Sequence, residues 1–257
     1  MNFQDELKIA LEASGAASKI IRDGYYEARD IHEKENKGIV TEIDLQSEKA
    51  ILDIIRSNSK HPILSEESEI EIDSETYWVV DPLDGTTNYS RQISLFATSI
   101  ALIQNNVVKV GVVENPILNE RFSAIEGLGA FLNSSRISVS KTDSLKGSVM
   151  FLNSGYSKDA LDVFAKATQS LADKCYLRKL GTTALELCYL AKGSADSFLS
   201  FGDELWDYAA GIIIVQEAGG MVTDWKGNNW NNTNSYIYAS NRNVHEELLQ
   251  HTDPLQS

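Results

Sequence analysis

The sequence has few cysteines and no apolar run long enough to cross a membrane. Only Cys175 and Cys188 occur among its 257 residues. Two thiols are too few for a disulfide framework, so a reduced, cytoplasmic setting is expected. The N-terminal segment has no basic start followed by an apolar stretch, which argues against a secretory signal. The longest apolar run lies around residues 211–215, and we expect no membrane partner.

Positive charge is also scarce. The chain has 23 Lys and Arg residues against 37 Asp and Glu residues, a formal net charge of -14. Because so negative a surface repels nucleic acid phosphates, we expect no nucleic acid partner. An enzyme with a phosphorylated substrate would need a local source of positive charge. Bound cations are the obvious source.

Histidine is rare as well, with four residues in the chain. All four lie in charged or loop segments away from the motifs described below, which favours a surface position and argues against a phosphohistidine mechanism. These residues are His32, His61, His245 and His251.

The overall pattern predicts one α/β domain over residues 1–257, built in layers. An α+β half to about residue 135 reads as helices followed by antiparallel strands, and the half from about 136 to 257 alternates strands and helices. Helices are predicted near the N-terminus and over residues 44–58, 158–173, 182–192 and 205–218. A solvated loop or hairpin is predicted for the charged stretch 27–37.

Carboxylates stand next to apolar runs at four places, which involve Glu66, Asp81 with Asp84, Asp207 and Asp44. Each has an ordinary explanation when taken alone, as a solvated loop, a turn or a helix cap. Their joint occurrence beside apolar runs indicates a site instead.

Residues 81–88, with the sequence DPLDGTTN, carry the most specific of these signals. A buried strand delivers Asp81 at its carboxyl end, and Pro82 is expected to turn the chain. Gly85 and the two threonines after it then offer backbone N–H groups at a helix start, which suits a phosphate. Carboxylates beside a phosphate need cations between them. Hard oxygen ligands without His or Cys favour Mg²⁺ over Zn²⁺.

These motifs, together with residues 40–44 and 181–184, resemble the signature segments of the inositol monophosphatase family. The resemblance covers nearly the whole chain in the same order. It implies an αβαβα five-layer sandwich, a homodimer, inhibition by lithium, and Mg²⁺-dependent hydrolysis of a small phosphorylated substrate.

The resemblance also implies ligands for two to three Mg²⁺ ions. Glu66, Asp81 and the backbone carbonyl of Leu83 would hold the first ion. Asp81, Asp84 and Asp207 would hold the second, and Glu66 with waters would hold a third, weaker one.

The remaining roles concern water and substrate. Catalysis is assigned to Asp44, Thr86 and Glu66, with Thr86 and the Asp44 behind it orienting or deprotonating the attacking water. A basic residue near the third metal would be Lys34 or Lys37. Phosphate and substrate contacts are assigned to Gly85, Thr86, Asp84, Thr183 and Lys34.

Two departures from the family pattern bear on the substrate. Ser65 replaces the glycine that usually precedes the paired glutamates. Ser200 occupies the position, seven before Asp207, where animal inositol monophosphatases place a sugar-binding acid. That change removes an acceptor for inositol hydroxyls. Inositol 1-phosphate is the first choice of substrate, and fructose 1,6-bisphosphate and NADP 2′-phosphate are alternatives.

Two other functions compete with this interpretation. Haloacid-dehalogenase-type phosphatases use an Asp-x-Asp-Gly-Thr motif with an aspartyl nucleophile, but here two residues separate Asp81 from Asp84. A catalytically inactive metal-binding regulator with the same fold is the alternative outside the enzymes. Loss of Asp44 or Thr86 would favour it, and both are present.

Overall fold

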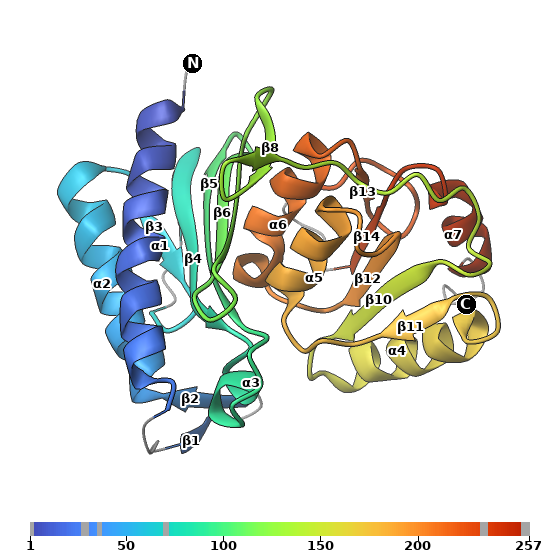
Figure 1. The fold of residues 1–257 in the computed structure, drawn as a ribbon, viewed down its shortest axis with the longest axis horizontal. Helices are drawn as coiled ribbons and strands as arrows, with labels where there is room; N and C mark the ends of the chain where they lie inside the picture. Colours follow the sequence, from blue (N-terminus) through green and yellow to red (C-terminus); the bar gives the residue numbers. More distant parts are fainter. Residues whose placement is uncertain (1–2, 27–30, 35–37, 69–71, 232–235, 253–257) are drawn as a thin grey trace.

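The computed structural model describes residues 3–26, 31–34, 38–68, 72–231 and 236–252, with the backbone alone for 31–34 and 38–40. The described chain forms five layers, with helices outside, two sheets, and a helical layer between the sheets (Figure 1). The expected αβαβα layered fold is confirmed.

Two helices cover the outer face of the larger sheet (Figure 1). They are α1 (Gln4–Gly24) and α2 (Glu42–Asn58). Small and branched residues of α1 recur at helical spacing, and Ala10, Ala17 and Ile21 are fully buried against the sheet. The charged segment between the helices contains a short antiparallel pair, β1 (Ile31–Lys34) and β2 (Gly38–Thr41), as the hairpin alternative predicted.

The larger sheet has seven strands in chain order, and all neighbours are antiparallel except β3 and β4. The strands are β3 (Ile63–Ser65), β4 (Thr76–Asp84), β5 (Ala97–Gln104), β6 (Val107–Asn115), β7 (Glu120–Ile125), β8 (Gly129–Leu132) and β9 (Ser135–Arg136). The five-residue helix α3 (Thr86–Ser90) follows β4 directly.

The smaller sheet has the order β11-β10-β12-β14-β13, with β10 parallel to both of its neighbours. Helices α4 (Lys158–Leu171) and α7 (His245–Thr252) lie on its outer side (Figure 1). The pattern of the sequence did not predict α7 or the short strands β13 and β14. The strands are β10 (Val149–Ser154), β11 (Tyr176–Arg178), β12 (Ser197–Phe201), β13 (Met221–Thr223) and β14 (Tyr236–Ser240).

The central layer consists of α5 (Thr183–Ala191) and α6 (Leu205–Glu217). Both helices are apolar on nearly every side because each faces a sheet or the other helix. The packing is tight enough to require glycine: a Cβ on Gly111 would lie 2.6 Å from the carbonyl oxygen of Ala210. One apolar cluster therefore includes residues of both sheets, such as Phe122 and Phe198. The division into halves near residue 135 stays a prediction.

His245 corrects one expectation about the surface. Its side chain is 4% exposed, and its ring nitrogens lie 2.9 Å from the hydroxyls of Thr223 and Ser240. A satisfied core histidine replaces the predicted surface residue, because α7 packs against the smaller sheet. Among the described residues, none of the helices combines the length and the apolar character that a membrane crossing needs.

Candidate active site

Three carboxylates from two distant segments meet between the central layer and the larger sheet. Carboxylate oxygens of Asp81, Asp84 and Asp207 all lie within 4.8 Å of one another. Asp81 and Asp84 belong to the end of β4, and Asp207 lies in the first turn of α6. The sequence-based grouping of these three residues therefore corresponds to a real cluster.

An irregularity in β4 allows Asp81 and Asp84 to point the same way. Asp81 pairs with Ser99 and Asp84 with Ala97, so β4 has one more residue than β5 between the two pairs. Without that bulge, residues three apart in a strand would face opposite sides. Pro82 favours a bulge because it has no N–H for the ladder. The expected turn at Pro82 is thus a bulge, and the chain leaves the strand at Gly85.

The cluster is electrostatically unfavourable without a cation. Burial raises the pKa of Asp81 well above its usual range, and repulsion from Glu66, Asp84 and Asp207 raises it further. Burial and the charges of Asp203 and Asp84 likewise raise the pKa of Asp207. No His, Cys or Arg lines this pocket among the described residues. An all-oxygen donor set of buried carboxylates that repel one another fits a hard divalent cation.

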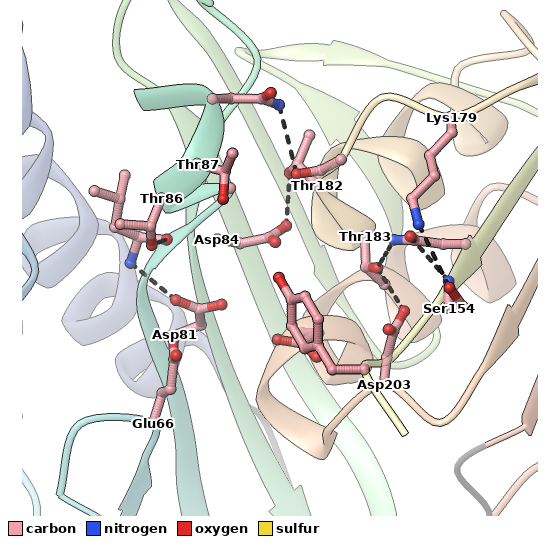
Figure 2. Close-up of a pocket in the computed structure, with 17 residues that line it drawn as sticks. Glu66, Asp81, Asp84, Thr86, Thr87, Ser154, Lys179, Thr182, Thr183 and Asp203 are labelled. Atoms are coloured by element: carbon pink, nitrogen blue, oxygen red, sulfur yellow. Dashed lines mark hydrogen bonds between the residues drawn. The ribbon is translucent and has the colours of Figure 1, made fainter. Parts of the chain in front are cut away.

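Glu66 reaches the same pocket from the next strand. It follows β3, which pairs in parallel with β4, and its backbone N–H donates to the carbonyl of Val80 at 3.2 Å. Parallel pairing therefore brings Glu66 to the end of β4 where Asp81 lies (Figure 2). Leu83 also lines this pocket, and its backbone N–H donates to Asp81 Oδ1 at 2.9 Å.

Asp44 and Thr86 form a pair at the edge of the pocket. The hydroxyl of Thr86 is 2.9 Å from Asp44 Oδ1 and 3.0 Å from the carbonyl oxygen of Leu83. Asp44 is 1% exposed, and its other oxygen accepts from the backbone and hydroxyl of Thr41, completing a capping box at the start of α2. Burial raises the pKa of Asp44 above its usual value. Asp44 therefore caps α2 and also holds Thr86, whose side chain lines the pocket.

Gly85 makes the junction between β4 and α3 possible. Its φ is +91°, and a Cβ there would lie 3.0 Å from the carbonyl oxygen of Leu95 and 3.2 Å from Phe96 Cβ. Only glycine adopts this conformation in so little space. The following residues Thr86 and Thr87 line the pocket, as the predicted phosphate cradle requires (Figure 2).

The start of α5 closes the pocket on the side of Asp84. Asp84 Oδ2 accepts from the hydroxyl of Thr182 at 2.6 Å and from the backbone N–H of Ala184 at 2.7 Å. Thr183, which the resemblance assigned to the substrate, lines the pocket; it is 3% exposed, and its hydroxyl donates to Asp203 Oδ2 at 2.7 Å. Its hydroxyl also accepts from Asn153 at 2.6 Å.

Sequence reasoning missed several residues of this pocket. Asp203 and Lys179 line it, together with Asn153, Ser154 and Tyr156. Asp203 stands one helical turn before Asp207 in the sequence, and that spacing was the available signal. Of the two basic candidates, Lys34 ends β1 without a described side chain, and Lys37 lies outside the described residues.

Asp84 gives the metal-free protein a pH-dependent stability. Burial raises its pKa to about 7 from an ordinary value of 3.8. Between these values the folded protein binds a proton that the unfolded chain has lost. The free energy of unfolding therefore falls as the pH rises from about 4 to about 7. Below this window the carboxyl is protonated in both states, and above it the carboxyl is charged in both.

In EDTA, Asp84→Asn should therefore gain stability over the wild type progressively between about pH 4 and pH 7, then stay level. Urea unfolding of both proteins across this range measures the difference. The pKa of His245, which burial lowers to about 4, changes proton binding in the opposite sense but is common to both proteins. A difference that does not vary with pH would contradict the assignment.

The match between this chain and known proteins spans almost its whole length. The sequence profile of the inositol monophosphatase family covers residues 3–257. This chain belongs to the inositol monophosphatase family. Nus factor SuhB of Pasteurella multocida is 38% identical over 98% of this chain and 97% of its own. Inositol monophosphatase 3 of Solanum lycopersicum is 36% identical over 95% of each chain. The IMPase structure from Thermotoga maritima has a TM-score of 0.90 and 34% identity, covering 98% of each chain.

Membership in the inositol monophosphatase family gives the acidic cluster its setting. The family comprises phosphatases that are in general Mg²⁺-dependent and act on small phosphorylated substrates. The cluster of Asp81, Asp84 and Asp207 supplies the carboxylate oxygens that such metal binding needs.

Proposed function

We propose that this protein is a Mg²⁺-dependent phosphomonoesterase that hydrolyses a small polyol or sugar phosphate, with inositol 1-phosphate as the first candidate. One observation carries the proposal: the carboxylates of Asp81, Asp84 and Asp207 line a single pocket of about 400 Å³ together with Thr86, whose hydroxyl donates to Asp44 behind it. Carboxylates for cations, a polarised hydroxyl for water and backbone N–H groups for phosphate are the parts that direct hydrolysis of a phosphate ester requires.

Two to three Mg²⁺ ions would be held by Glu66, Asp81, Asp84 and Asp207, with the carbonyl of Leu83. When bound, Mg²⁺ lowers the pKa of water and neutralises charge on a phosphate. Asp84 and Asp81 are fixed by backbone N–H groups, which would hold their oxygens in place as ligands.

Thr86 and Asp44 would position the attacking water. The single hydroxyl proton of Thr86 is directed to Asp44 Oδ1 or to Leu83, which leaves Thr86 Oγ1 as an acceptor on the pocket side. A water that donates to Thr86 Oγ1 is then oriented for in-line attack, and Asp44 is the final proton acceptor. The backbone N–H groups of Gly85 and Thr86 would hold the phosphate oxygens.

Thr86→Ala should lower kcat by roughly 10²-fold, the usual scale for a proton-transfer partner. Metal affinity should stay close to that of the wild type, because Thr86 holds no ion in this scheme. Steady-state kinetics measures the first effect, and the rise in melting temperature on adding Mg²⁺ measures the second.

Thr86→Ser is the matched control for that variant. It keeps the hydroxyl and should retain most of the activity. A loss of Mg²⁺ binding in Thr86→Ala would contradict the assigned role. So would a phosphoenzyme trapped on Asp81, which would favour the dehalogenase-type chemistry instead.

A phosphate-release screen tests the proposed function directly. The purified protein with Mg²⁺ is offered inositol 1-phosphate, fructose 1,6-bisphosphate and NADP, and release from at least one of them is expected. If Mg²⁺ stabilises the protein but no ester is hydrolysed, the metal-binding regulator becomes the better account. Cleavage of fructose 1,6-bisphosphate or NADP without cleavage of inositol 1-phosphate would favour the corresponding alternative substrate.

A further inference from the structure

The wall of the pocket opposite Glu66 and Asp81 carries two charged groups that the proposed hydrolysis does not use. They are the ammonium group of Lys179 and the carboxylate of Asp203 (Figure 2). In the part of the chain with described side chains, Lys179 is the one Lys or Arg that lines the pocket. This single cation faces a cavity otherwise rich in carboxylates.

Asp203 is held by neighbours that engage only one of its two oxygens. Its Oδ2 accepts from the hydroxyls of Thr183 and Ser200, and Thr183 is fixed in turn by Asn153. No hydrogen bond from the described residues reaches Oδ1, although the residue is 8% exposed and lines the pocket. Ser200, which replaces the sugar-binding acid of animal relatives, thus orients Asp203. Its Oδ1 remains an acceptor for a hydroxyl group in the pocket.

The backbone next to Lys179 is fixed from two sides. The N–H of Leu180 donates to Glu186 Oε1 at 2.5 Å, and its carbonyl accepts from Asn88 Nδ2 at 2.7 Å. Glu186 is fully buried in α5, so this segment is anchored to the central layer. The root of the Lys179 side chain is therefore rigid at the rim of the pocket.

The ammonium group itself has weak partners within the described structure. Its Nζ lies 3.5 Å from Ser154 Oγ, at the outer limit of a hydrogen bond, and 4.9 Å from the centre of the Phe164 ring. No carboxylate of the described residues forms an ion pair with it. Its electrostatic partner in the pocket is Asp203: burial raises the pKa of that carboxyl, and the charge of Lys179 opposes the rise without forming an ion pair. The side chain is exposed, so a second phosphate on the alcohol could reach its ammonium group and form a charge-assisted hydrogen bond that a neutral polyol cannot offer.

We propose that Lys179 and Asp203 form a leaving-group subsite that selects esters whose alcohol carries a second phosphate. Asp203 Oδ1 accepts a hydroxyl of the alcohol, and Lys179 binds the second phosphate at the rim. The inference rests on the proposed phosphatase function and narrows its substrate to a sugar bisphosphate. The cavity of about 400 Å³ is of the size that holds small ligands.

The test compares fructose 1,6-bisphosphate with fructose 1-phosphate, which differ in the second phosphate alone. Lys179→Met should lower kcat/KM for the bisphosphate at least roughly tenfold, mainly through KM, the scale of one hydrogen bond to a charged group. For the monophosphate it should change less than about twofold. Lys179→Arg should restore the preference. Asp203→Asn should raise KM for both esters equally, because both present the same hydroxyls.

Arg178→Met is the matched control. Arg178 is the neighbour of Lys179 in the chain and carries the same charge, but it does not line the pocket. An equal change for both fructose esters in Lys179→Met, or no change for either, would overturn the inference. NADP serves as a second arm: a loss confined to NADP would assign Lys179 to a pyrophosphate instead. If the wild type hydrolyses none of these esters, the proposed function fails, and calorimetric titration of the same pair with Mg²⁺ still tests the subsite.

Discussion

Removal of divalent cations is expected to abolish phosphate release completely, and added Mg²⁺ should restore it. The physical reason lies in the clustered carboxylates of Asp81, Asp84 and Asp207, which repel one another and would also repel a phosphate ester. Without a cation between them, the anionic substrate cannot approach the hydroxyl of Thr86. Phosphate release is measured before dialysis against EDTA, after it, and after return of Mg²⁺.

A second measurement separates metal binding from catalysis. Mg²⁺ that binds the folded protein alone should raise its stability, by about 2.7 kcal/mol when its concentration is a hundred times the Kd. Thermal unfolding with and without Mg²⁺ reads this directly. Activity that survives exhaustive chelation would refute the proposed chemistry. A rise in stability of the same size with Na⁺ would indicate general screening of the net charge of -14 instead.

Asp207→Asn should lower kcat/KM by about 10³-fold or more, which corresponds to several kcal/mol of transition-state stabilisation. The variant loses a negative charge but keeps an oxygen that can accept from the N–H of Glu204, as Asp207 Oδ2 does at 2.8 Å. The cap of α6 therefore survives, and the loss of activity reports on the missing charge. Steady-state kinetics at saturating Mg²⁺ measures the effect.

The stability of the same variant should change in the opposite direction. In EDTA it should unfold at a higher temperature than the wild type, because burial and neighbouring carboxylates disfavour the charged form of Asp207. The gain in stability from Mg²⁺ should shrink. Asp159→Asn, an exposed residue in the first turn of α4, makes the same chemical change; it should leave the kinetics and the gain from Mg²⁺ unaltered, and it should not raise the unfolding temperature, since a first-turn acid stabilises its helix. Kinetics of Asp207→Asn within tenfold of the wild type would contradict the assigned role.

The sequence was most informative about the motifs and helices whose residues are consecutive in the chain. The segment 81–88 places Asp81, Asp84, Gly85 and Thr86 within one strand end and one helix start, so its sequence alone predicted that they lie together. Helices α2, α4 and α5 begin or end within a few residues of the predicted bounds, since amphipathic or apolar periodicity is a local property.

Errors arose where distant segments pack together. His245 reads as a polar residue beside a loop, yet the packing of α7 buries it between Thr223 and Ser240. The bulge in β4 replaces the turn expected at Pro82 because the pairing with β5 continues to Asp84. Neither outcome can be deduced from neighbours in the chain alone.

The sequence by itself determined the layered fold, the family and the acids of the candidate site, because the motifs that carry them are contiguous. Only the tertiary structure decided that Asp203 is oriented by Thr183 and Ser200, and that Lys179 faces the same pocket from the segment before α5. The reason is physical: the far wall is assembled by contacts between α5, β10 and β12, which are separated in the chain. The character of the leaving group that a pocket accepts depends on such contacts.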